Sequence, residues 1–163
     1  MKIILIIGAG QLGSRHLQGL LKFPQPWKIF VLDPSPESLE FAKKRAQEVH
    51  HNHQVSFVNN WHDIPTSFDL VIVATNADVR EEVVSVLLAN YDVKYLILEK
   101  VLFQELGSYL RVSDLIKKYN VTTWVNHPRR MFDSYKEVKR LLTTGSQKIM
   151  QITGGNWGLG CNT

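Results

Sequence analysis

Short apolar runs alternate with helical patterns along most of the chain. Ile3–Ile7 is a continuous apolar run rich in β-branched residues, which is typical of a strand buried on both faces of a parallel sheet. Gln11–Lys22 predicts a helix, because residues recur at helical spacing on one side of it: Leu12, His16, Leu17, Leu20 and Leu21. A second strand is expected over Ile29–Leu32. Ser35-Pro36-Glu37 then supplies an N-cap, a proline at the first helical position and an early acid for a second helix.

The same alternation continues to Leu142. Strands are predicted near Val55–Val58, Leu70–Ala74, Tyr95–Leu98 and Thr122–Val125, and helices over Asp78–Ala89, Leu106–Lys118 and Phe132–Leu142. A polar loop through Pro65 separates the third and fourth strands. Strands that alternate with helices in units of this size indicate an α/β fold with a doubly wound parallel sheet, the Rossmann fold.

The last segment of the chain departs from this rhythm. Ile149–Thr153 predicts one more strand, and the tail that follows is rich in glycine. We therefore expect a dinucleotide-binding domain over residues 1–145, and only the beginning of a second, α+β domain over residues 146–163.

Composition and charge narrow the class of protein. Of the 163 residues, 44% are hydrophobic and 21% charged, which is enough apolar material for one substantial core. The net charge of +4 is mild, and basic residues share their helical patterns with acids, so solvated helix faces are favoured over nucleic-acid binding. The apolar run near the start is too short for a signal or membrane segment. With Cys161 as the single cysteine, a cytoplasmic protein is expected.

A glycine motif lies between the first strand and the first helix. In Gly8-Ala9-Gly10-Gln11-Leu12-Gly13, the first glycine permits a tight turn, the second lets a pyrophosphate approach, and the third allows close helix packing. Asp33 follows the second strand, twenty residues beyond Gly13, where a carboxylate accepts hydrogen bonds from ribose hydroxyls. Cofactor contacts are therefore predicted for Gly8, Gly10, Gln11, Leu12, Gly13 and Asp33. A methyltransferase has a similar pattern, but the third glycine favours a dinucleotide, and Asp33 favours NAD over NADP.

Two pairs of polar residues follow later strands. Thr75 and Asn76 come after the fourth strand, and Glu99 and Lys100 after the fifth, so all four lie at carboxyl ends, where open α/β sheets bind ligands. Lys100 is the candidate proton-handling group beside a nicotinamide. The alternative is a surface lysine paired with Glu99.

His50, His51 and His53 invite a metal-binding interpretation, but no carboxylate or cysteine stands at a recognised ligand spacing. They follow a predicted helix, so capping of its C-terminus is the favoured role, and no metal is expected.

The sequence resembles the N-terminal half of the Gfo/Idh/MocA oxidoreductases, the group of glucose-fructose oxidoreductase and inositol dehydrogenase. The motif residues that carry the resemblance are Gly8–His16, Ala74–Asn76, Leu98–Lys100 and Val125–Phe132. It implies NAD(P)-dependent hydride transfer to or from a hydroxyl of a sugar, inositol or related small molecule. It also implies that Lys100 contacts cofactor and substrate, and that Asn126 with Arg129 or Arg130 binds substrate.

The chain departs from the family pattern at two positions. Val101 replaces a proline after the lysine, and Arg80 stands where many members have histidine. By the same resemblance, the second domain would complete the substrate site and form a homo-oligomer, so the chain alone is expected to bind cofactor without turnover. A non-catalytic NAD-binding sensor or scaffold module is the alternative function.

Overall fold

The computed structural model describes residues 1–142. The chain divides into two units, residues 1–126 and the segment from residue 127 onward, and each is described by itself. The strand predicted over Ile149–Thr153 and the domain boundary near residue 145 lie outside the described residues.

The first unit follows the predicted order of strands and helices. Its strands are β1 (Ile3–Ile7), β2 (Lys28–Leu32), β3 (Gln54–Val58), β4 (Ser67–Phe68), β5 (Leu70–Val73), β6 (Asp92–Val93), β7 (Tyr95–Glu99) and β8 (Thr122–Asn126). Its helices are α1 (Gln11–Leu21), α2 (Pro36–Gln47), the 3-10 turn η1 (Trp61–Asp63), α3 (Arg80–Asn90) and α4 (Leu106–Lys118). The predicted long elements are confirmed, with ends that differ by one or two residues.

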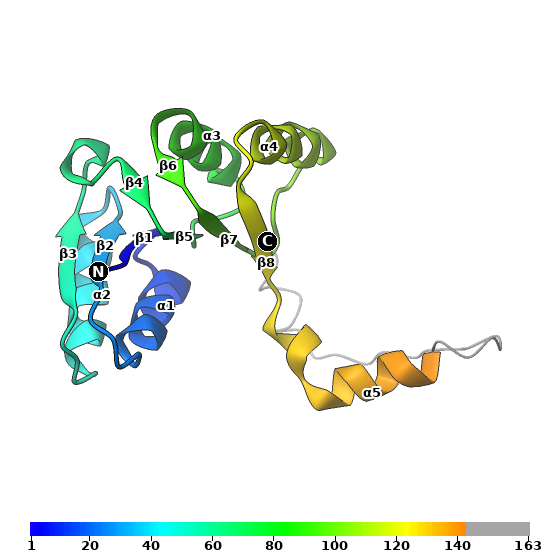
Figure 1. Ribbon diagram of the computed structural model, residues 1–163, viewed down its shortest axis with the longest axis horizontal. Coiled ribbons are helices and arrows are strands. Elements are labelled where there is room, and N and C mark those ends of the chain that lie inside the picture. The colour runs from blue at the N-terminus through cyan, green and yellow to red at the C-terminus, as the bar shows by residue number, and fades with distance from the viewer. Residues whose placement is uncertain (143–163) are drawn as a thin grey trace. The chain divides into compact units, whose positions relative to one another are not determined.

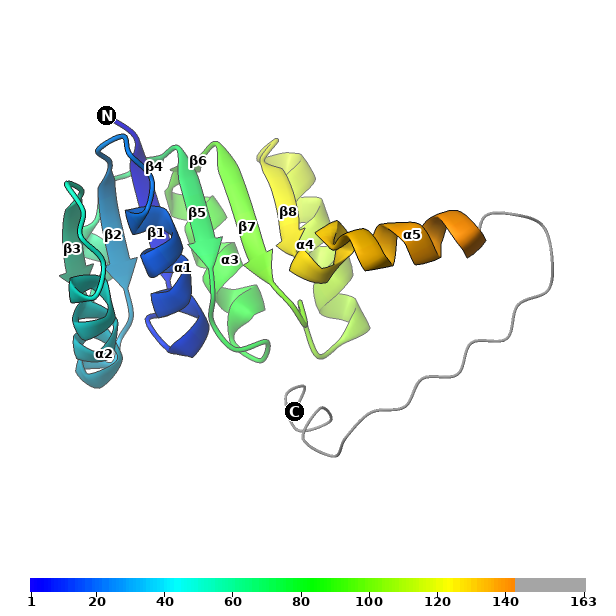
Figure 2. The same ribbon diagram turned by 90° about the horizontal axis from the view of Figure 1, so that it is seen from below.

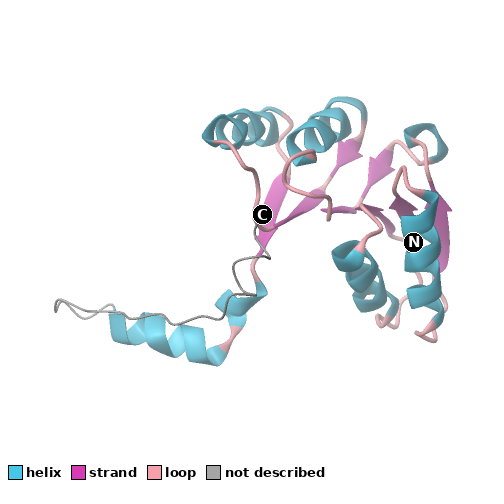
Figure 3. Cartoon of the chain, turned by 180° about the vertical axis from the view of Figure 1, so that it is seen from behind, coloured by secondary structure: helices cyan, strands magenta, loops and turns pink. Residues whose placement is uncertain are grey.

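Six strands form one parallel sheet in the order β3-β2-β1-β5-β7-β8. Helices α1 and α2 cover one face of this sheet, and α3 and α4 cover the other (Figures 1 and 2). Figure 3 shows the same layers by element type. The chain moves outward from β1 in one direction through β2 and β3, then returns to β5 on the other side of β1. This is the doubly wound Rossmann arrangement, and its strand order reverses between β1 and β5.

The core has two halves because successive strand residues point to opposite faces. In β1, Ile4 and Ile6 pack on the α1 and α2 side, whereas Leu5 and Ile7 pack on the α3 and α4 side. Both sets are buried. This two-sided burial explains why β1 has a continuous apolar run in place of alternating polar residues.

Two local features were not evident from the hydrophobic pattern. Leu12 is 49% exposed. It lies in the first turn of α1, within the glycine motif, and is absent from the core cluster that contains Leu17. The polar loop through Pro65 is followed directly by β4, which pairs in parallel with β6 as a separate two-stranded sheet. Two-residue strands carry too little hydrophobic pattern to be recognised in a sequence.

The histidines after α2 do not cap that helix. His53 is buried, accepts a 3.1 Å hydrogen bond from the Trp27 amide at Nδ1, and places Nε2 3.1 Å from the Phe23 carbonyl oxygen. The histidine therefore ties the loop after α1 to the start of β3. The C-cap residue that follows α2, Glu48, is held by backbone hydrogen bonds instead.

The described part of the second unit consists of two helical segments. They are the 3-10 turn η2 (Pro128–Met131) and α5 (Asp133–Leu142). Within residues 1–142, no helix has the length and apolar character needed to cross a membrane.

Candidate dinucleotide-binding site

The candidate site lies at the carboxyl edge of the large sheet, next to the point where the strand order reverses. All six strands are parallel, so the residues that follow β1, β2, β5 and β7 meet at this edge. The predicted residues in these positions are Gly8 to Gly13, Asp33, Thr75 with Asn76, and Glu99 with Lys100. Open α/β sheets bind their ligands in this crevice.

The glycine loop requires glycine at two positions for different physical reasons. Gly8 has a φ of +96°, a backbone conformation that L side chains rarely adopt. At Gly13, a Cβ atom would lie 1.7 Å from the carbonyl oxygen of Gly8, so α1 packs against the loop at a distance that no side chain tolerates. These contacts confirm the turn and packing roles expected of the first and third glycines.

Gly10 differs from both, because a Cβ atom built on it would meet nothing within 4 Å. Its φ of −66° is accessible to any residue. The fold therefore does not require glycine here, and open space remains beside the loop. The close approach of a pyrophosphate at Gly10 stays a prediction.

Helices α1 and α2 begin differently. Ser35 caps α2 by accepting a 3.2 Å hydrogen bond from the Ser38 amide, whereas no side chain in the described part of the chain caps α1, whose N-cap is Gly10. A helix start leaves several N–H donors without intrahelical partners and carries a partial positive charge. The start of α1 can therefore donate to an anionic group such as a phosphate.

Asp33 lies against this loop. Its Oδ2 accepts a 2.7 Å hydrogen bond from the Ala9 amide, and its Oδ1 accepts a 2.8 Å hydrogen bond from the Ser35 amide. The carboxylate thus joins the end of β2 to the glycine loop. Each oxygen of an ionised carboxylate accepts more than one hydrogen bond, so capacity for ribose hydroxyls remains.

Arg80, at the start of α3, is a buried charged side chain near the site. It is 2% exposed, and its guanidinium donates to the carbonyl oxygens of Glu99, Val101, Leu102 and Thr75. Burial lowers the pKa of Arg80, while the negative charge of Glu99 opposes that shift. One side chain therefore joins the end of β5 to the segment after β7 that carries Lys100. The Lys100–Val101 peptide bond in that segment is cis.

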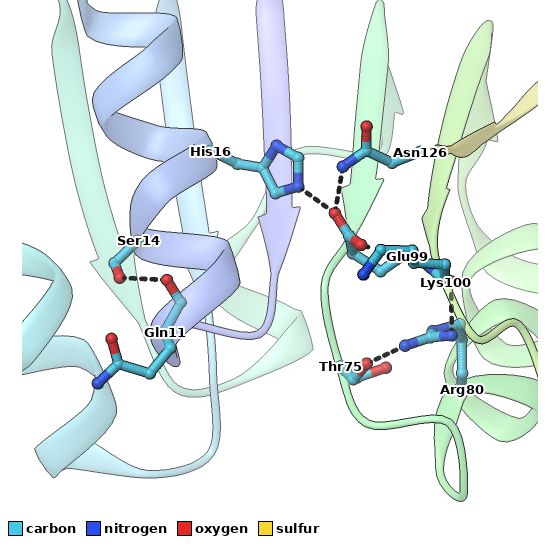
Figure 4. Close-up of polar contacts among 8 residues, drawn as sticks. All are labelled: Gln11, Ser14, His16, Thr75, Arg80, Glu99, Lys100 and Asn126. Carbon is cyan, nitrogen blue, oxygen red and sulfur yellow. Dashed lines mark hydrogen bonds and ion pairs between the residues drawn. The ribbon is translucent and has the colours of Figure 1, made fainter. Parts of the chain in front are cut away.

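Glu99 is a buried carboxylate with three donors. Its side chain is 2% exposed, and Oε1 lies 2.6 Å from His16 Nε2 and also accepts from the Asn126 side-chain amide. Its Oε2 accepts a 3.2 Å hydrogen bond from the Lys100 amide. Figure 4 shows Glu99 between His16 of α1 and Asn126 of β8. Burial raises the pKa of Glu99, but the hydrogen bonds from His16 and Asn126 outweigh it and leave the pKa below its usual value.

Lys100 and Asn76 are exposed at this edge, and Thr75 is half-buried. Among the described residues, no ion pair joins Lys100 to Glu99; His16 and Asn126 hold that carboxylate instead. The hydroxyl of Thr75 is buried and has no hydrogen-bond partner among residues 1–142. The ligand roles of Thr75, Asn76, Glu99 and Lys100 stay predictions.

The candidate substrate residues do not all fall in the same unit. Asn126 ends β8 in the first unit, where it donates to Glu99. Arg129 and Arg130 lie in η2 of the second unit, and both are exposed. Their part in substrate binding stays a prediction. Within the described residues, no three histidine, cysteine or acidic side chains are grouped as a metal site would require.

Sequence reasoning missed the contacts of His16 and Arg80. His16 belongs to the motif segment Gly8–His16 and was assigned to a helical stripe, while Arg80 was noted as a departure from a family pattern. A polar residue within an apolar helical stripe was the available signal for His16. The carbonyl groups that Arg80 contacts carry no side-chain signature, so its role depends on tertiary structure.

Solved structures share this fold. The myo-inositol dehydrogenase from Lactobacillus casei, solved in complex with NAD(H) and myo-inositol, is 22% identical, with a TM-score of 0.68 over 89% of this chain and 42% of that one. The WlbA dehydrogenase from Chromobacterium violaceum, solved with NADH and UDP-GlcNAcA, is 18% identical, with a TM-score of 0.71 over 85% of this chain and 39% of that one. The apo scyllo-inositol dehydrogenase from L. casei is 21% identical, with a TM-score of 0.66 over 89% and 42%.

The chain spans about two fifths of the length of these structures. No curated protein matches the sequence. The sequence model of the oxidoreductase family with an NAD-binding Rossmann fold, Gfo/Idh/MocA, matches residues 2–127. This match covers most of the chain and includes every residue of the sheet edge described above, so the chain belongs to the Gfo/Idh/MocA oxidoreductase family.

Proposed function

We propose that this chain binds NAD(H) for an oxidoreductase that transfers hydride between the nicotinamide and a hydroxyl or carbonyl group of a sugar, an inositol or a related small molecule. Membership of the family supports the oxidoreductase class. The substrate class rests on relatives of the same fold, among them the L. casei enzyme solved with NAD(H) and myo-inositol.

The observation that carries the proposal is the pairing of an uncapped helix start with Asp33. The α1 N-terminus has free donors beside the open space at Gly10, and the Asp33 carboxylate is bonded to the same loop through the Ala9 amide. In this fold a dinucleotide places its diphosphate at the start of the first helix and its ribose diol at the acid that follows the second strand. The residues present therefore fit the cofactor: donors for the diphosphate, and an acceptor for the diol.

NAD is favoured over NADP by the charge of Asp33. A carboxylate that accepts hydrogen bonds from the 2′-hydroxyl repels a 2′-phosphate. Arg45 is the nearby cation, but its guanidinium donates to the Gln11 carbonyl and side chain and to the Ser14 hydroxyl. Its hydrogen-bond donors are thus directed at α1.

We assign proton transfer to Lys100. Bound NAD supplies the ring that exchanges hydride with substrate. The Lys100 side chain is exposed at the carboxyl edge, while its backbone is fixed by the Arg80 hydrogen bonds to the flanking carbonyls. A fixed backbone with an exposed amino group is suited to proton transfer: the neutral amine accepts the hydroxyl proton when a substrate hydroxyl is oxidised, and the ammonium group returns it when a carbonyl is reduced.

The relatives are more than twice as long as this chain, and we propose that substrate turnover needs more than residues 1–163. On that proposal, residues 1–163 bind the cofactor but do not turn over substrate, and the complete enzyme is a homo-oligomer. We place it in the cytoplasm, because the sequence has a single cysteine and a reducing compartment requires no disulfide.

A calorimetric titration of the 163-residue chain tests the proposal. NADH, NADPH and S-adenosylhomocysteine are titrated separately, the last as the ligand of the methyltransferase alternative. Binding of NADH in preference to NADPH, with no heat from S-adenosylhomocysteine, is the expected result. Absence of NADH binding, or tighter binding of S-adenosylhomocysteine, contradicts the assigned function.

A further inference from the structure

Glu99 is a charged group buried where the fold alone does not need one. It ends β7, whose preceding residues Leu96 and Leu98 belong to the apolar core. Removing a carboxylate from water is costly unless hydrogen bonds compensate for the lost hydration. His16, Asn126 and the Lys100 amide provide that compensation. The arrangement is thus a set of polar groups dedicated to one carboxylate.

The donors to Glu99 come from both sides of the crevice. His16 lies on α1, one turn after Gly13 of the glycine loop, and Asn126 ends β8, next to β7 in the sheet. Figure 4 shows the His16 ring reaching from α1 toward Glu99 on the far side. His16 is thereby the direct side-chain link between the helix that begins at the glycine loop and the strand end that leads into Lys100.

We propose that His16 is a positioning residue that acts through Glu99 to hold Lys100 in place for the nicotinamide half of the cofactor. The inference rests on the proposed function, because it takes NAD(H) as the ligand and Lys100 as the group beside the nicotinamide. It gives a role to His16, which belongs to the motif segment Gly8–His16 but had no predicted part in the site.

The contacts explain how His16 acts at a distance. The ionised Glu99 carboxylate accepts the His16 Nε2–H at 2.6 Å with one oxygen and the Lys100 amide at 3.2 Å with the other. A rotation of the carboxylate that follows loss of His16 breaks or strains the second bond. Arg80 holds the carbonyl groups on either side of Lys100, so the Lys100 amide is the part of the segment that depends on Glu99.

A purely structural role for His16 makes a different prediction. His16 is partly exposed, with 22% of its side chain accessible, and its neighbour Leu17 provides the buried contact of this part of α1. Loss of a structural residue weakens the fold and every ligand that needs it. Loss of a positioning residue for Lys100 weakens only ligands that reach Lys100.

The test compares NADH with ADP-ribose, which contains the adenosine and diphosphate of NADH but no nicotinamide. Both are titrated calorimetrically into the wild-type chain and into His16→Ala, His16→Gln, Lys100→Ala and the double variant His16→Ala/Lys100→Ala. His62→Ala is the matched control, because His62 is an exposed histidine in η1. Thermal unfolding of each variant accompanies the titrations.

We expect the wild-type chain to bind NADH more tightly than ADP-ribose. His16→Ala lowers the NADH affinity on the order of tenfold, the size of one charge-assisted hydrogen bond, and leaves ADP-ribose affinity unchanged. His16→Gln restores most of the loss, because its side-chain amide retains an N–H donor for Glu99. The double variant loses no more than Lys100→Ala alone, since both changes remove the same interaction. His62→Ala matches the wild type.

Three outcomes overturn the inference while leaving the proposed function intact: equal losses of NADH and ADP-ribose in His16→Ala, additive losses in the double variant, or equal wild-type affinities for the two ligands. If the wild-type chain binds neither ligand, the proposed function itself fails. Should His16→Ala not fold, Asn126→Ala removes the other side-chain donor to Glu99 and must lower NADH affinity selectively. Wild-type NADH affinity in Asn126→Ala, or equal losses of NADH and ADP-ribose affinity, then overturns the inference.

Discussion

Arg80 Nη1 donates a 2.7 Å hydrogen bond to the carbonyl oxygen of Glu99, and through this contact the first residue of α3 is bound to the last residue of β7. The same guanidinium reaches Thr75 after β5 and Val101 and Leu102 after Lys100. Two strand ends of the candidate site therefore depend on one buried side chain.

Replacing Arg80 by methionine is expected to destabilise the first unit on the order of 3 kcal/mol. Methionine fills much of the volume but leaves buried carbonyl oxygens without donors, and each such group costs about 1–3 kcal/mol. Urea unfolding followed by circular dichroism measures the change. Arg111→Met is the control, because Arg111 is exposed and pairs with Glu81 on the surface, and it should have a small effect at neutral pH. Equal destabilisation by the two substitutions would show that the carbonyl contacts contribute little.

Gly10→Ala and Gly13→Ala separate ligand binding from folding within one loop. A methyl group at residue 13 collides with the Gly8 carbonyl oxygen, so Gly13→Ala should lose about 3 kcal/mol of stability through overpacking. A methyl group at residue 10 meets no protein atom, so Gly10→Ala should stay within about 1 kcal/mol of the wild type.

The affinity of the folded protein for NADH should depend more on residue 10 than its stability does. Gly10→Ala should weaken NADH binding on the order of tenfold, because the new methyl group occupies the space that the diphosphate enters. Thermal unfolding and calorimetric titration of the same sample measure the two effects. If Gly10→Ala binds NADH with wild-type affinity, the diphosphate does not lie against this loop.

Asp33→Asn should relax the preference for NADH over NADPH. Asparagine keeps one oxygen acceptor for the Ala9 or Ser35 amide but removes the charge that repels a 2′-phosphate. The dissociation constant for NADPH divided by that for NADH, both measured by titration, should fall several-fold, mainly through tighter NADPH binding. Glu37→Gln, which removes an exposed carboxylate from the first turn of α2, is the control and should leave the ratio unchanged. An unchanged ratio in Asp33→Asn would remove Asp33 from the ribose site.

The glycine loop shows which features of this protein could be predicted from the sequence. Gly8, Gly13 and Asp33 act through local backbone geometry and through their places after buried strands. These two features produce a sequence pattern that lies within about 25 residues. The long strands and helices were predictable for the same reason, since periodicity is a local property.

The contacts around Glu99 could not be predicted in this way. Glu99 was identified by its place after a strand, but its partner His16 is 83 positions away, and nothing in either segment specifies the pairing. Arg80 is a similar case, because it binds backbone carbonyls that every residue possesses. The β4 and β6 strands are too short to carry a period. The contacts of His53 with the Trp27 amide and the Phe23 carbonyl oxygen likewise depend on tertiary structure.

The pair Glu81 and Arg111 predicts a loss of stability in acid. The hydrogen bonds of Arg111, together with one from Ser108, lower the pKa of Glu81 from its usual 4.5 to about 2. A carboxylate with a lowered pKa in the folded state stabilises the protein above about pH 4.5 and loses that contribution as the pH falls toward 2. The effect is modest because the pair is exposed.

Thermal unfolding at pH 7 and pH 3 measures this contribution as a difference. Arg111→Met should lower the unfolding temperature at pH 7 slightly and should show a smaller drop between pH 7 and pH 3 than the wild type. Lys43→Met, at an exposed position of α2, is the matched control and should keep the wild-type drop. If Arg111→Met keeps the full drop as well, acid sensitivity arises from other carboxylates such as Asp69 and Glu99, whose pKa values are also lowered.

His51 predicts a second pH dependence, in a higher range. Burial and the neighbouring His53 and His50 lower the pKa of His51 below its usual 6.5, and its Nδ1 accepts a 3.2 Å hydrogen bond from the His53 amide. A histidine whose pKa is lowered in the folded state resists protonation there, so stability is full above about pH 6.5 and falls as the pH drops below it.

His51→Asn keeps an oxygen acceptor for the His53 amide and cannot be protonated. Its free energy of unfolding should match the wild type at pH 7.5 and exceed it at pH 5.5, in urea titrations at both pH values. His62→Asn should follow the wild type at both. A wild-type pH dependence in His51→Asn would mean that the hydrogen bond to the His53 amide survives protonation of His51 or contributes nothing to stability.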